Sequence, residues 1–398
     1  MKEEHVLEKV YEPRRLLDAW QQVKRNAGAA GIDRMTVEEF ESRKEELFPI
    51  IYRALKAGSY RFKPARRVLI PKEGPKGKFR KLGIPVVMDR IVSASMTLVF
   101  EDIFDPGFTE SNFGFRRGKS QHQAIEYVRE TVEEGYEWCA SVDLKSFFDE
   151  IPHDLILKLI RQKIADERLV TLVARALKAG VIVEGTFEKT TKGSPQGSPL
   201  SPMLSNIVLN ELDHELERRG LKYCRWADDF VILVKSERAA KRVLEGITLY
   251  AEEELGLPVN REKSEAALVK DVDFLGFRIL RSKIRVSEKS REKFKRRAPR
   301  NNGLSMNQVI ARLNLYLRGW IRNRLRSMQL KKWKNPHKFQ RIMMASGCTA
   351  EYAHQIWMRM NRWQSVRRKE VMLVLNLQWF NKRGLISLHQ YSPSTLTP

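Results

Sequence analysis

Two short apolar runs, residues 221–226 and 230–234, flank a pair of adjacent carboxylates, Asp228 and Asp229. The second run is too apolar for a solvated edge and predicts a strand that is buried on both faces. The pattern therefore predicts a β-hairpin with the two carboxylates at or near its turn. Unpaired carboxylates beside a buried strand are costly, and a bound divalent cation would remove most of that cost. For the dipeptide alone, an ordinary Asp-containing turn is the better explanation, because Asp is common in turns.

The rest of the chain alternates between helical and strand periods, separated by Gly- and Pro-rich turns. Helices are predicted over residues 10–26, from 36, over 89–104 (amphipathic), over 121–134, within 155–180, from 201 and over 237–255. Strands are predicted on both sides of a basic turn within 61–90, over 138–143, as a hairpin within 181–191, and over 272–279 paired with 283–286. Ser201 is expected to cap a helix that has Pro202 at its first position.

The composition is that of a globular protein of two or three domains. The chain has 398 residues, of which 42% are hydrophobic and 31% charged. No apolar run approaches the roughly 20 residues of a membrane-spanning helix, and the polar N-terminus does not predict a secretory leader. The three cysteines lie far apart, so neither a zinc site nor a disulfide framework is expected, and the compartment is expected to be reducing.

Positive charge is concentrated in one part of the chain. The net charge is +24, and residues 281–340 hold 19 Lys and Arg against two Glu, a net of +17. Such a localised field predicts a polyanionic partner, with a nucleic acid as the first candidate. A solvated basic face is the alternative, which the interleaved aromatic residues Tyr316, Trp320 and Trp333 make less attractive.

Further residues combine with the acidic pair into one chemistry. Asp143 ends a predicted buried strand, a good position for a metal ligand, although a helix N-cap explains it equally well when taken by itself. Lys72 and Arg80 on the basic hairpin suit a triphosphate, although a solvated hairpin is the better explanation when the hairpin is taken by itself. The loop at residues 195–197 has a Gly that allows close backbone approach to a ligand. Nucleotidyl transfer by two metal ions needs carboxylates, phosphate-binding cations and such a loop.

In combination and order, these motifs resemble the group II intron-encoded reverse transcriptases, also called maturases. The resemblance extends from residue 31 to residue 385. It is carried by Ile70-Pro71-Lys72, Leu82-Gly83-Ile84-Pro85, Phe113-Gly114-Phe115-Arg116, Asp143-Leu144-Lys145-Ser146-Phe147-Phe148-Asp149, Pro195-Gln196-Gly197, Ala227-Asp228-Asp229, Phe274-Leu275-Gly276-Phe277 and Leu317-Arg318-Gly319-Trp320.

The resemblance implies an α+β right-hand polymerase, with fingers and palm built on antiparallel sheet, a helical thumb and a helical C-terminal DNA-binding segment. The expected domains are fingers and palm (1–285), a basic thumb or maturase domain (286–340) and a DNA-binding-like segment (341–398). The implied activity is RNA-directed DNA synthesis with two Mg²⁺ ions, for which Mn²⁺ could substitute. The implied partners are an RNA template such as group II intron RNA, a DNA primer or target, and deoxynucleoside triphosphates, without a membrane. The oligomeric state stays open, and the expected location is the bacterial cytoplasm, in a nucleoid-associated ribonucleoprotein.

The resemblance also assigns roles to residues. The catalytic residues would be Asp143, Asp228 and Asp229. The metal ligands would be these three residues and Leu144. Asp228 would bind the metal ions together with Asp143, whereas Asp229 would be more peripheral, because adjacent strand residues point to opposite faces. The nucleotide would be bound by Lys72, Arg80, Gln196 and Phe148. Phe148 would also exclude a 2′-hydroxyl, and Phe147 is the competing candidate for that role. Nucleic acid would be bound by Arg116, Arg318, Trp320, Arg324, Arg326 and Lys332.

Three departures from the family pattern keep alternatives open. Trp226 stands where the family usually has Tyr, the segment after Trp320 predicts a shortened thumb, and no His-Asn-His-type endonuclease is expected. A domesticated, intron-free reverse transcriptase acting in DNA repair or anti-phage defence is therefore one alternative. A non-catalytic RNA-binding splicing factor is an alternative of another class.

Overall fold

The computed structural model describes residues 2–71, 79–281 and 283–297, together with residues 341, 344 and 349. The chain divides into two compact units, Met1–Ser287 and Glu288–Pro398. All elements below belong to the first unit, except the helix α12 (Glu288–Arg297).

Four helices form the N-terminal part of the first unit. They are α1 (Val6–Tyr11), α2 (Pro13–Asn26), α3 (Val37–Ser42) and α4 (Lys44–Lys56). The helix predicted from residue 10 is divided before Pro13, which begins α2. Thr36 and Glu39 form a capping box at the start of α3, as expected for a helix that begins there. The Trp20 and Phe40 rings, 4.7 Å apart, join α2 to α3 in the core.

A four-stranded sheet, here called the hairpin sheet, confirms the strands predicted around the basic turn and within 181–191. Its strands are β1 (Ala65–Pro71), β2 (Phe79–Ile84), β4 (Val181–Val183) and β5 (Thr186–Glu188), in the order β2-β1-β4-β5. β1 and β2 are antiparallel, as are β4 and β5, whereas β1 and β4 are parallel. The sheet is therefore mixed, and the basic turn itself lies outside the described residues.

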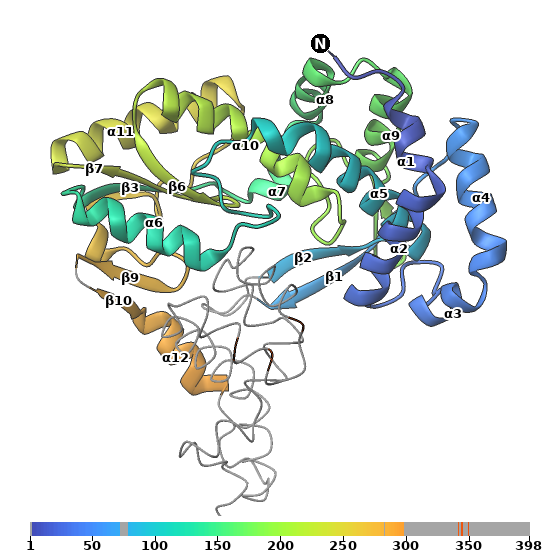
Figure 1. The fold of residues 1–398 in the computed structure, drawn as a ribbon, viewed down its shortest axis with the longest axis horizontal. Coiled ribbons are helices and arrows are strands. Elements are labelled where there is room, and N and C mark those ends of the chain that lie inside the picture. Colours follow the sequence, from blue (N-terminus) through green and yellow to red (C-terminus); the bar gives the residue numbers. More distant parts are fainter. Residues whose placement is uncertain are drawn as a thin grey trace, which may run out of the picture. The chain divides into compact units, whose positions relative to one another are not determined.

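A second four-stranded sheet, here called the central sheet, is antiparallel throughout. Its strands are β3 (Trp138–Asp143), β6 (Lys222–Trp226), β7 (Asp229–Val234) and β8 (Glu265–Leu268), in the order β6-β7-β3-β8. The run 230–234 is buried along its whole length, as predicted. Alternate residues of β7 enter separate core clusters, so both faces of the sheet are covered. The helix α11 (Glu237–Leu249) covers one face and α6 (Gln121–Glu133) the other (Figure 1).

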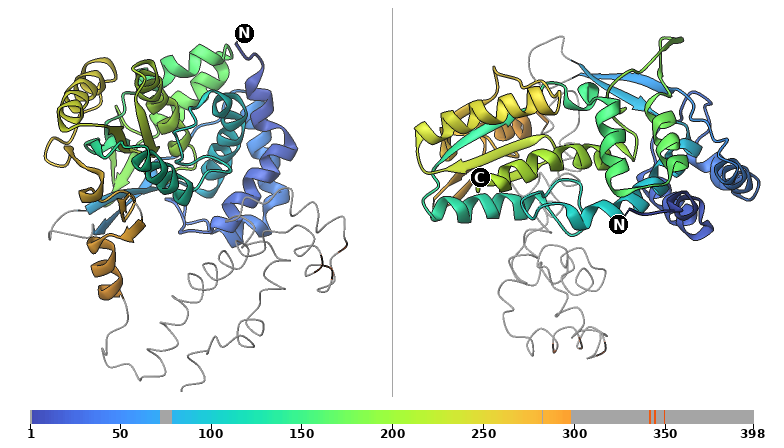
Figure 2. Two further views of the ribbon diagram at one scale, coloured as in Figure 1. Left: turned by 60° about the vertical axis from the view of Figure 1, so that its left-hand side comes forward. Right: turned by 90° about the horizontal axis from the view of Figure 1, so that it is seen from above.

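Two long helices join the N-terminal helices to the central sheet (Figure 2). They are α5 (Val87–Phe104) and α10 (Ser201–Arg218). The prediction that α5 is amphipathic was wrong, because most of its residues are buried between neighbouring elements. Leu200, rather than Ser201, is the N-cap of α10, and the Ser201 hydroxyl instead donates to the Pro195 carbonyl oxygen at 2.9 Å.

The remaining elements are shorter. They are η1 (Asp105–Gly107), α7 (Phe147–Glu150), α8 (His153–Lys163), α9 (Glu167–Leu177), the π-helical turn η2 (Tyr250–Glu254), η3 (Val269–Asp271), and the antiparallel pair β9 (Phe277–Leu280) and β10 (Lys283–Val286). β9 starts later than predicted, because Leu275 and Gly276, both with positive φ, turn the chain first. The mixed α and β architecture confirms the α+β class, while the predicted thumb and C-terminal segment lie largely outside the described residues.

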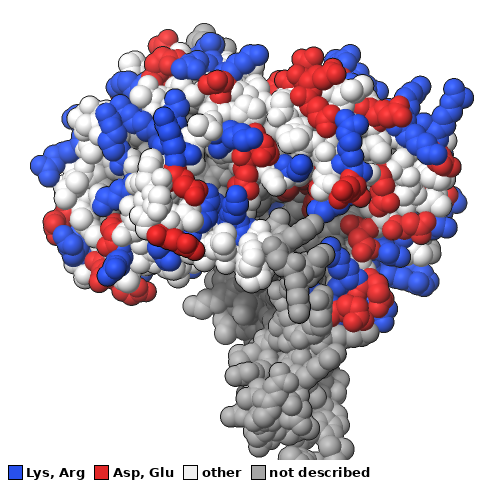
Figure 3. All heavy atoms as spheres, turned by 180° about the vertical axis from the view of Figure 1, so that it is seen from behind, with Lys and Arg blue, Asp and Glu red and all other residues white. Residues whose placement is uncertain are grey.

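The surface of the described part carries both signs of charge. Seen from behind, basic and acidic side chains are interspersed over this face (Figure 3). Among the described residues, no helix has the length and apolar character needed to cross a membrane.

Candidate active site

The turn between β6 and β7, here called the acidic turn (residues 226–229), carries the predicted carboxylates. Trp226 pairs with Asp229, which leaves Ala227 and Asp228 as the two loop residues. Ala227 has a φ of 58° while Asp228 does not have a positive φ, as in a type II′ turn, which usually has Gly first. Holding an alanine there costs on the order of 1 kcal/mol. The turn confirms the predicted hairpin and projects Asp228 from its tip.

Asp143 lies beside this turn because β3 pairs with β7. The register sets Asp143 directly opposite Asp229, so their side chains share one face of the sheet. Asp229 is exposed and Asp228 is half-buried. The argument from strand alternation therefore applies only in part, since Asp228 belongs to the turn and Asp229 is the cross-strand neighbour of Asp143. The structure brings all three predicted carboxylates together.

The electrostatics single out Asp228. Burial is the main cause that raises the pKa of this carboxyl group, and the negative charge of Asp143 raises it further. Arg80 and Lys263 act in the opposite direction. The Lys263 ammonium lies 3.5 Å from an Asp143 carboxylate oxygen, at a largely exposed position where such a pair contributes little to stability. The site thus holds two close carboxylates with partial compensation by cations.

Leu144, the predicted backbone ligand, follows Asp143 at the end of β3. It forms an antiparallel bridge with Val259, flanked by hydrogen bonds from Asn260 N to Asp143 O and from Lys145 N to Pro258 O, both 2.8 Å long. In such a non-hydrogen-bonded pair, the Leu144 carbonyl points away from Val259. The Leu144 carbonyl oxygen therefore accepts no hydrogen bond in the pairing with the segment around Val259.

The loop before α10, here called the Gly/Pro loop (residues 193–199), docks on the strand that carries Arg80. Gly83 N of β2 donates to Gln196 O at 2.7 Å. Gly197 has a φ of +116°, and a Cβ there would lie 2.4 Å from Gly83 O, so only glycine fits. Gln196 is half-buried in this contact and Arg80 is exposed three residues before Gly83. The two predicted nucleotide-binding elements therefore form one unit.

Phe148 lies where the Gly/Pro loop meets the segment after Asp143. Ser194 N donates to Phe148 O at 2.7 Å, and a Cβ on Gly193 would lie 2.8 Å from the same oxygen. Phe147 is a core residue with 3% exposure, whereas Phe148 is half-buried at the edge of the core. Of the two candidates, Phe148 is thus the one that presents ring surface to solvent.

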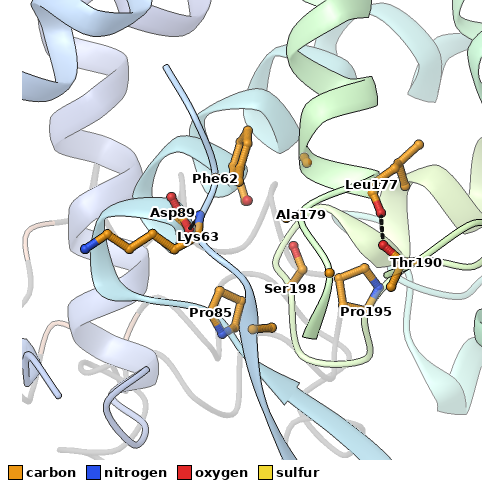
Figure 4. Close-up of a pocket in the computed structure, with 13 residues that line it drawn as sticks. Phe62, Lys63, Pro85, Asp89, Leu177, Ala179, Thr190, Pro195 and Ser198 are labelled. Atoms are coloured by element: carbon orange, nitrogen blue, oxygen red, sulfur yellow. Dashed lines mark hydrogen bonds between the residues drawn. The ribbon is translucent and has the colours of Figure 1, made fainter. Parts of the chain in front are cut away.

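A small cavity lies behind the Gly/Pro loop (Figure 4). Lys63, Pro85 and Asp89 line one side, and Pro195 and Ser198 line the other. The Asp89 carboxylate accepts hydrogen bonds from the Tyr60 hydroxyl at 2.7 Å and from Lys63 N at 2.9 Å. Burial nevertheless raises the pKa of Asp89 to about 6. The cavity is therefore largely apolar but contains one titratable carboxyl group.

The structure gives Arg116 contacts that argue against its predicted role in nucleic-acid binding. Its side chain is 7% exposed, and its guanidinium donates to the Asp105 carboxylate at 2.7 Å and to the Thr109 carbonyl at 2.7 Å. It also donates to the Asn112 carbonyl. These bonds fix the loop before α6. The predicted residues Lys72, Arg318, Trp320, Arg324, Arg326 and Lys332 lie outside the described residues.

Two side chains at the site were missed from the sequence. Lys263 reaches Asp143 only because β3 pairs with β8, a contact between segments 120 residues apart. His153 is buried, with Nε2 2.7 Å from the Gly193 carbonyl oxygen, and burial lowers its pKa, so it stays neutral and donates that hydrogen bond. The available sequence signal for His153 was its position after the predicted strand that ends at Asp143 and after the aromatic residues Phe147 and Phe148.

The donor set fits hard divalent cations. Among the described residues, no group of three or more Asp, Glu, His and Cys side chains is arranged to enclose a metal ion. Mg²⁺, however, is commonly held by one or two carboxylates together with substrate phosphates and water. Asp143 and Asp228, whose charges repel each other, meet that requirement.

The family model described as reverse transcriptase (RNA-dependent DNA polymerase) matches residues 70–279, just over half of the chain. The chain belongs to the reverse transcriptase family. The matched range contains every residue of the site described above that is given a catalytic or nucleotide-binding role. The expected resemblance is thereby confirmed at the level of the family.

Several curated relatives of this reverse transcriptase are intron-encoded proteins. It is 33% identical over 303 residues to protein YkfC of Escherichia coli, covering 66% of this chain and 79% of YkfC. It is 34% identical over 209 residues to the group II intron-encoded protein LtrA of Lactococcus lactis, covering 52% of this chain but only 34% of LtrA. A solved telomerase structure from Candida tropicalis is 13% identical, covers 67% of this chain and 57% of the telomerase, and has a TM-score of 0.46.

Proposed function

We propose that this chain is an RNA-directed DNA polymerase of group II intron type. One observation carries the proposal: Asp143 lies across from the acidic turn, and the charge of Arg80 reaches Asp228 from a strand to which the Gly/Pro loop is docked. Nucleotidyl transfer requires this grouping of carboxylates, a cation and a loop of close backbone approach. Membership of the reverse transcriptase family supports the same reaction.

Asp143 and Asp228, with the Leu144 carbonyl, would hold two Mg²⁺ ions. When bound, such ions activate the primer hydroxyl and stabilise the pyrophosphate leaving group. Asp228 serves as the central carboxylate because it is half-buried and projects from the turn. Asp229, directly opposite Asp143 in the sheet register, contributes further negative charge, and the Lys263 ammonium partly compensates the charge of Asp143.

The incoming nucleotide is held by the unit formed from β2 and the Gly/Pro loop. Arg80 grips the triphosphate oxygens, together with Lys72 from the same hairpin. Gln196 lines the pocket, and the Phe148 ring lies below the sugar, where it leaves no room for a 2′-hydroxyl. The contact of Ser194 N with Phe148 O supports this role, because it ties the ring's backbone to the loop that lines the pocket.

RNA and the primer would be bound in part by the basic region at residues 281–340, including Arg318, Trp320, Arg324, Arg326 and Lys332. We further propose that the chain binds group II intron RNA to assist splicing and mobility, which its similarity to the group II intron-encoded protein LtrA supports. A role outside intron mobility, in repair or defence, is the second candidate, and the observation that favours it is Trp226 in place of the family's usual Tyr. Intron RNA domains flanking the gene would support the first role, and their absence the second.

Primer extension tests the proposed reaction. The full chain, with Mg²⁺, is incubated with a labelled DNA primer on an RNA template, and on a DNA template of the same sequence for comparison. We expect template-dependent extension on RNA. Tight RNA binding without any extension, over a range of salt concentrations and templates, would instead identify a non-catalytic RNA-binding factor.

A further inference from the structure

The acidic turn rests on a buried polar network that the proposed reaction does not itself use. Arg225, next to the turn, is fully buried, as is its partner Asp213 on α10. Arg225 Nε donates to the two Asp213 carboxylate oxygens at 2.8 and 3.0 Å, and Nη2 donates to Asp213 as well. A buried ion pair of this kind adds little net stability compared with apolar side chains of the same volume. Its value therefore lies in the geometry that it imposes.

The remaining donors of Arg225 reach the turn itself. Nη1 donates to the Asn206 side-chain oxygen at 2.8 Å and to the Ala227 carbonyl oxygen at 3.2 Å. Ala227 is the residue with the unfavourable positive φ, and its carbonyl belongs to the peptide that leads into Asp228. The planar guanidinium thus fixes the orientation of that peptide, which an ammonium could not do with the same geometry.

Asn206 connects the same network to the other side of the turn. Its Nδ2 donates to the Gly114 carbonyl oxygen at 2.9 Å. A Cβ on Gly114 would lie 2.2 Å from Ala227 N, so the backbone of this segment is in direct contact with the turn. The acidic turn is therefore held by Arg225 on one side and by Gly114 on the other, and Asn206 of α10 bonds to both.

The helix α10 also anchors the Gly/Pro loop. At its first residue, the Ser201 hydroxyl donates to the Pro195 carbonyl oxygen at 2.9 Å and lies 2.5 Å from the Ser194 hydroxyl. Ser201 and Asp213 are twelve residues apart, about 18 Å along a helix. One rigid element thus contacts the loop that lines the nucleotide pocket and the network that holds Asp228.

We propose that Arg225, Asp213 and Asn206 are positioning residues, which hold the Asp228 carboxylate at a fixed place relative to Asp143 and the Gly/Pro loop. The expected change in kcat rests on the proposed function, whereas the expected change in metal binding does not. Loss of the network displaces the peptide before Asp228 without removing any ligand. Supporting groups of this kind typically contribute 10- to 100-fold in metal affinity or activity.

The test uses Arg225→Lys and Asn206→Ala in the full chain, with Asp166→Asn as a matched control. Asp166 is a buried carboxylate that accepts hydrogen bonds from Leu7 N and Arg168, far along the chain from the acidic turn. Asn206→Ala keeps the Arg225–Asp213 pair, so it remains informative if Arg225→Lys does not fold. Four quantities are measured: Mn²⁺ binding by electron paramagnetic resonance, kcat for primer extension, KM for the deoxynucleotide, and the thermal midpoint.

We expect both variants to bind Mn²⁺ about 10- to 100-fold more weakly and to lose kcat by a similar factor, with KM for the nucleotide changed by less than about threefold. Asp166→Asn is expected to lower the thermal midpoint alone. Wild-type Mn²⁺ binding and kcat in both network variants would overturn the inference, as would equal losses in the control. If the wild-type chain extends no primer, the proposed function fails, whereas the Mn²⁺ comparison still decides the positioning role.

Discussion

The buried carboxyl group of Asp89 predicts a specific dependence of stability on pH. Its residue is 2% exposed, and its pKa of about 6 compares with an ordinary value of 3.8. Since one pKa unit corresponds to about 1.4 kcal/mol, the ionised group costs the folded state about 3 kcal/mol. Because the pKa is raised in the folded state, the contribution of Asp89 to stability is most favourable below pH 3.8 and is lost as pH rises through about 6.

Replacing Asp89 by Asn removes this charge while keeping the shape of the side chain. The linkage relation gives a cost of ionisation of about 1 kcal/mol at pH 4.5 and about 3 kcal/mol at pH 8. The amide also loses the bond from Lys63 N, which opposes the gain by about 1 kcal/mol at every pH. We therefore expect Asp89→Asn to be about as stable as the wild type at pH 4.5 and about 2 kcal/mol more stable at pH 8.

Urea unfolding followed by circular dichroism, at half-unit steps from pH 4.5 to pH 8, measures this difference. Asp166→Asn is the control, because hydrogen bonds from Leu7 N and Arg168 overcome the effect of burial and lower the pKa of Asp166. A lowered pKa makes its contribution constant above pH 4.5, so that variant should be less stable by the same amount throughout. Parallel curves for the wild type and Asp89→Asn would refute the reasoning.

Three further predictions concern the nucleotide site. Phe148→Val opens space below the sugar, so the preference for deoxyribonucleotides over ribonucleotides should fall by at least about 10-fold in single-nucleotide incorporation, while an unchanged preference would exclude the proposed role. Arg80→Ala should raise KM for the deoxynucleotide more than it lowers kcat, because a phosphate contact is removed from bound substrate, and the reverse split would contradict ground-state binding. Gly197→Ala forces a Cβ to within 2.4 Å of Gly83 O, so nucleotide incorporation should fall. Gly58→Ala is the control, because Gly58 also has a positive φ but has open space around it, and this variant should leave incorporation unchanged. Equal effects of the two variants would show that the backbone strain of a positive φ, and not the contact with Gly83, is responsible.

Several elements could be predicted from the sequence because their signals are local. An apolar run beside two carboxylates predicts the hairpin, and the capping residues around Thr36 predict the start of a helix. The position of Asp229 opposite Asp143 could not be predicted, since it depends on the register between β3 and β7. The same holds for Lys263, which only the pairing of β3 with β8 brings to Asp143.

Arg116 shows the converse case, in which a local pattern suggested the wrong environment. A basic residue in a Gly-containing loop is typical of phosphate binding, but Asp105, the first residue of η1, lies within reach and engages the guanidinium. Arg225 likewise lies only three residues before Asp228 in the sequence, yet the strand period turns it into the core. Sequence spacing alone does not distinguish an Arg that binds ligand from one that supports the site.

Extension of a DNA primer on an RNA template by the wild type, Asp143→Asn, Asp228→Asn, Asp229→Asn and the exposed control Asp18→Asn tests the central claim most directly. We predict extension by the wild type and by Asp18→Asn at equal rates. Asp143→Asn and Asp228→Asn should be slower by on the order of 10³-fold or more, with a smaller loss for Asp229→Asn. Undiminished extension by Asp228→Asn, or none by the wild type, would contradict the assignment of the acidic turn as the catalytic centre.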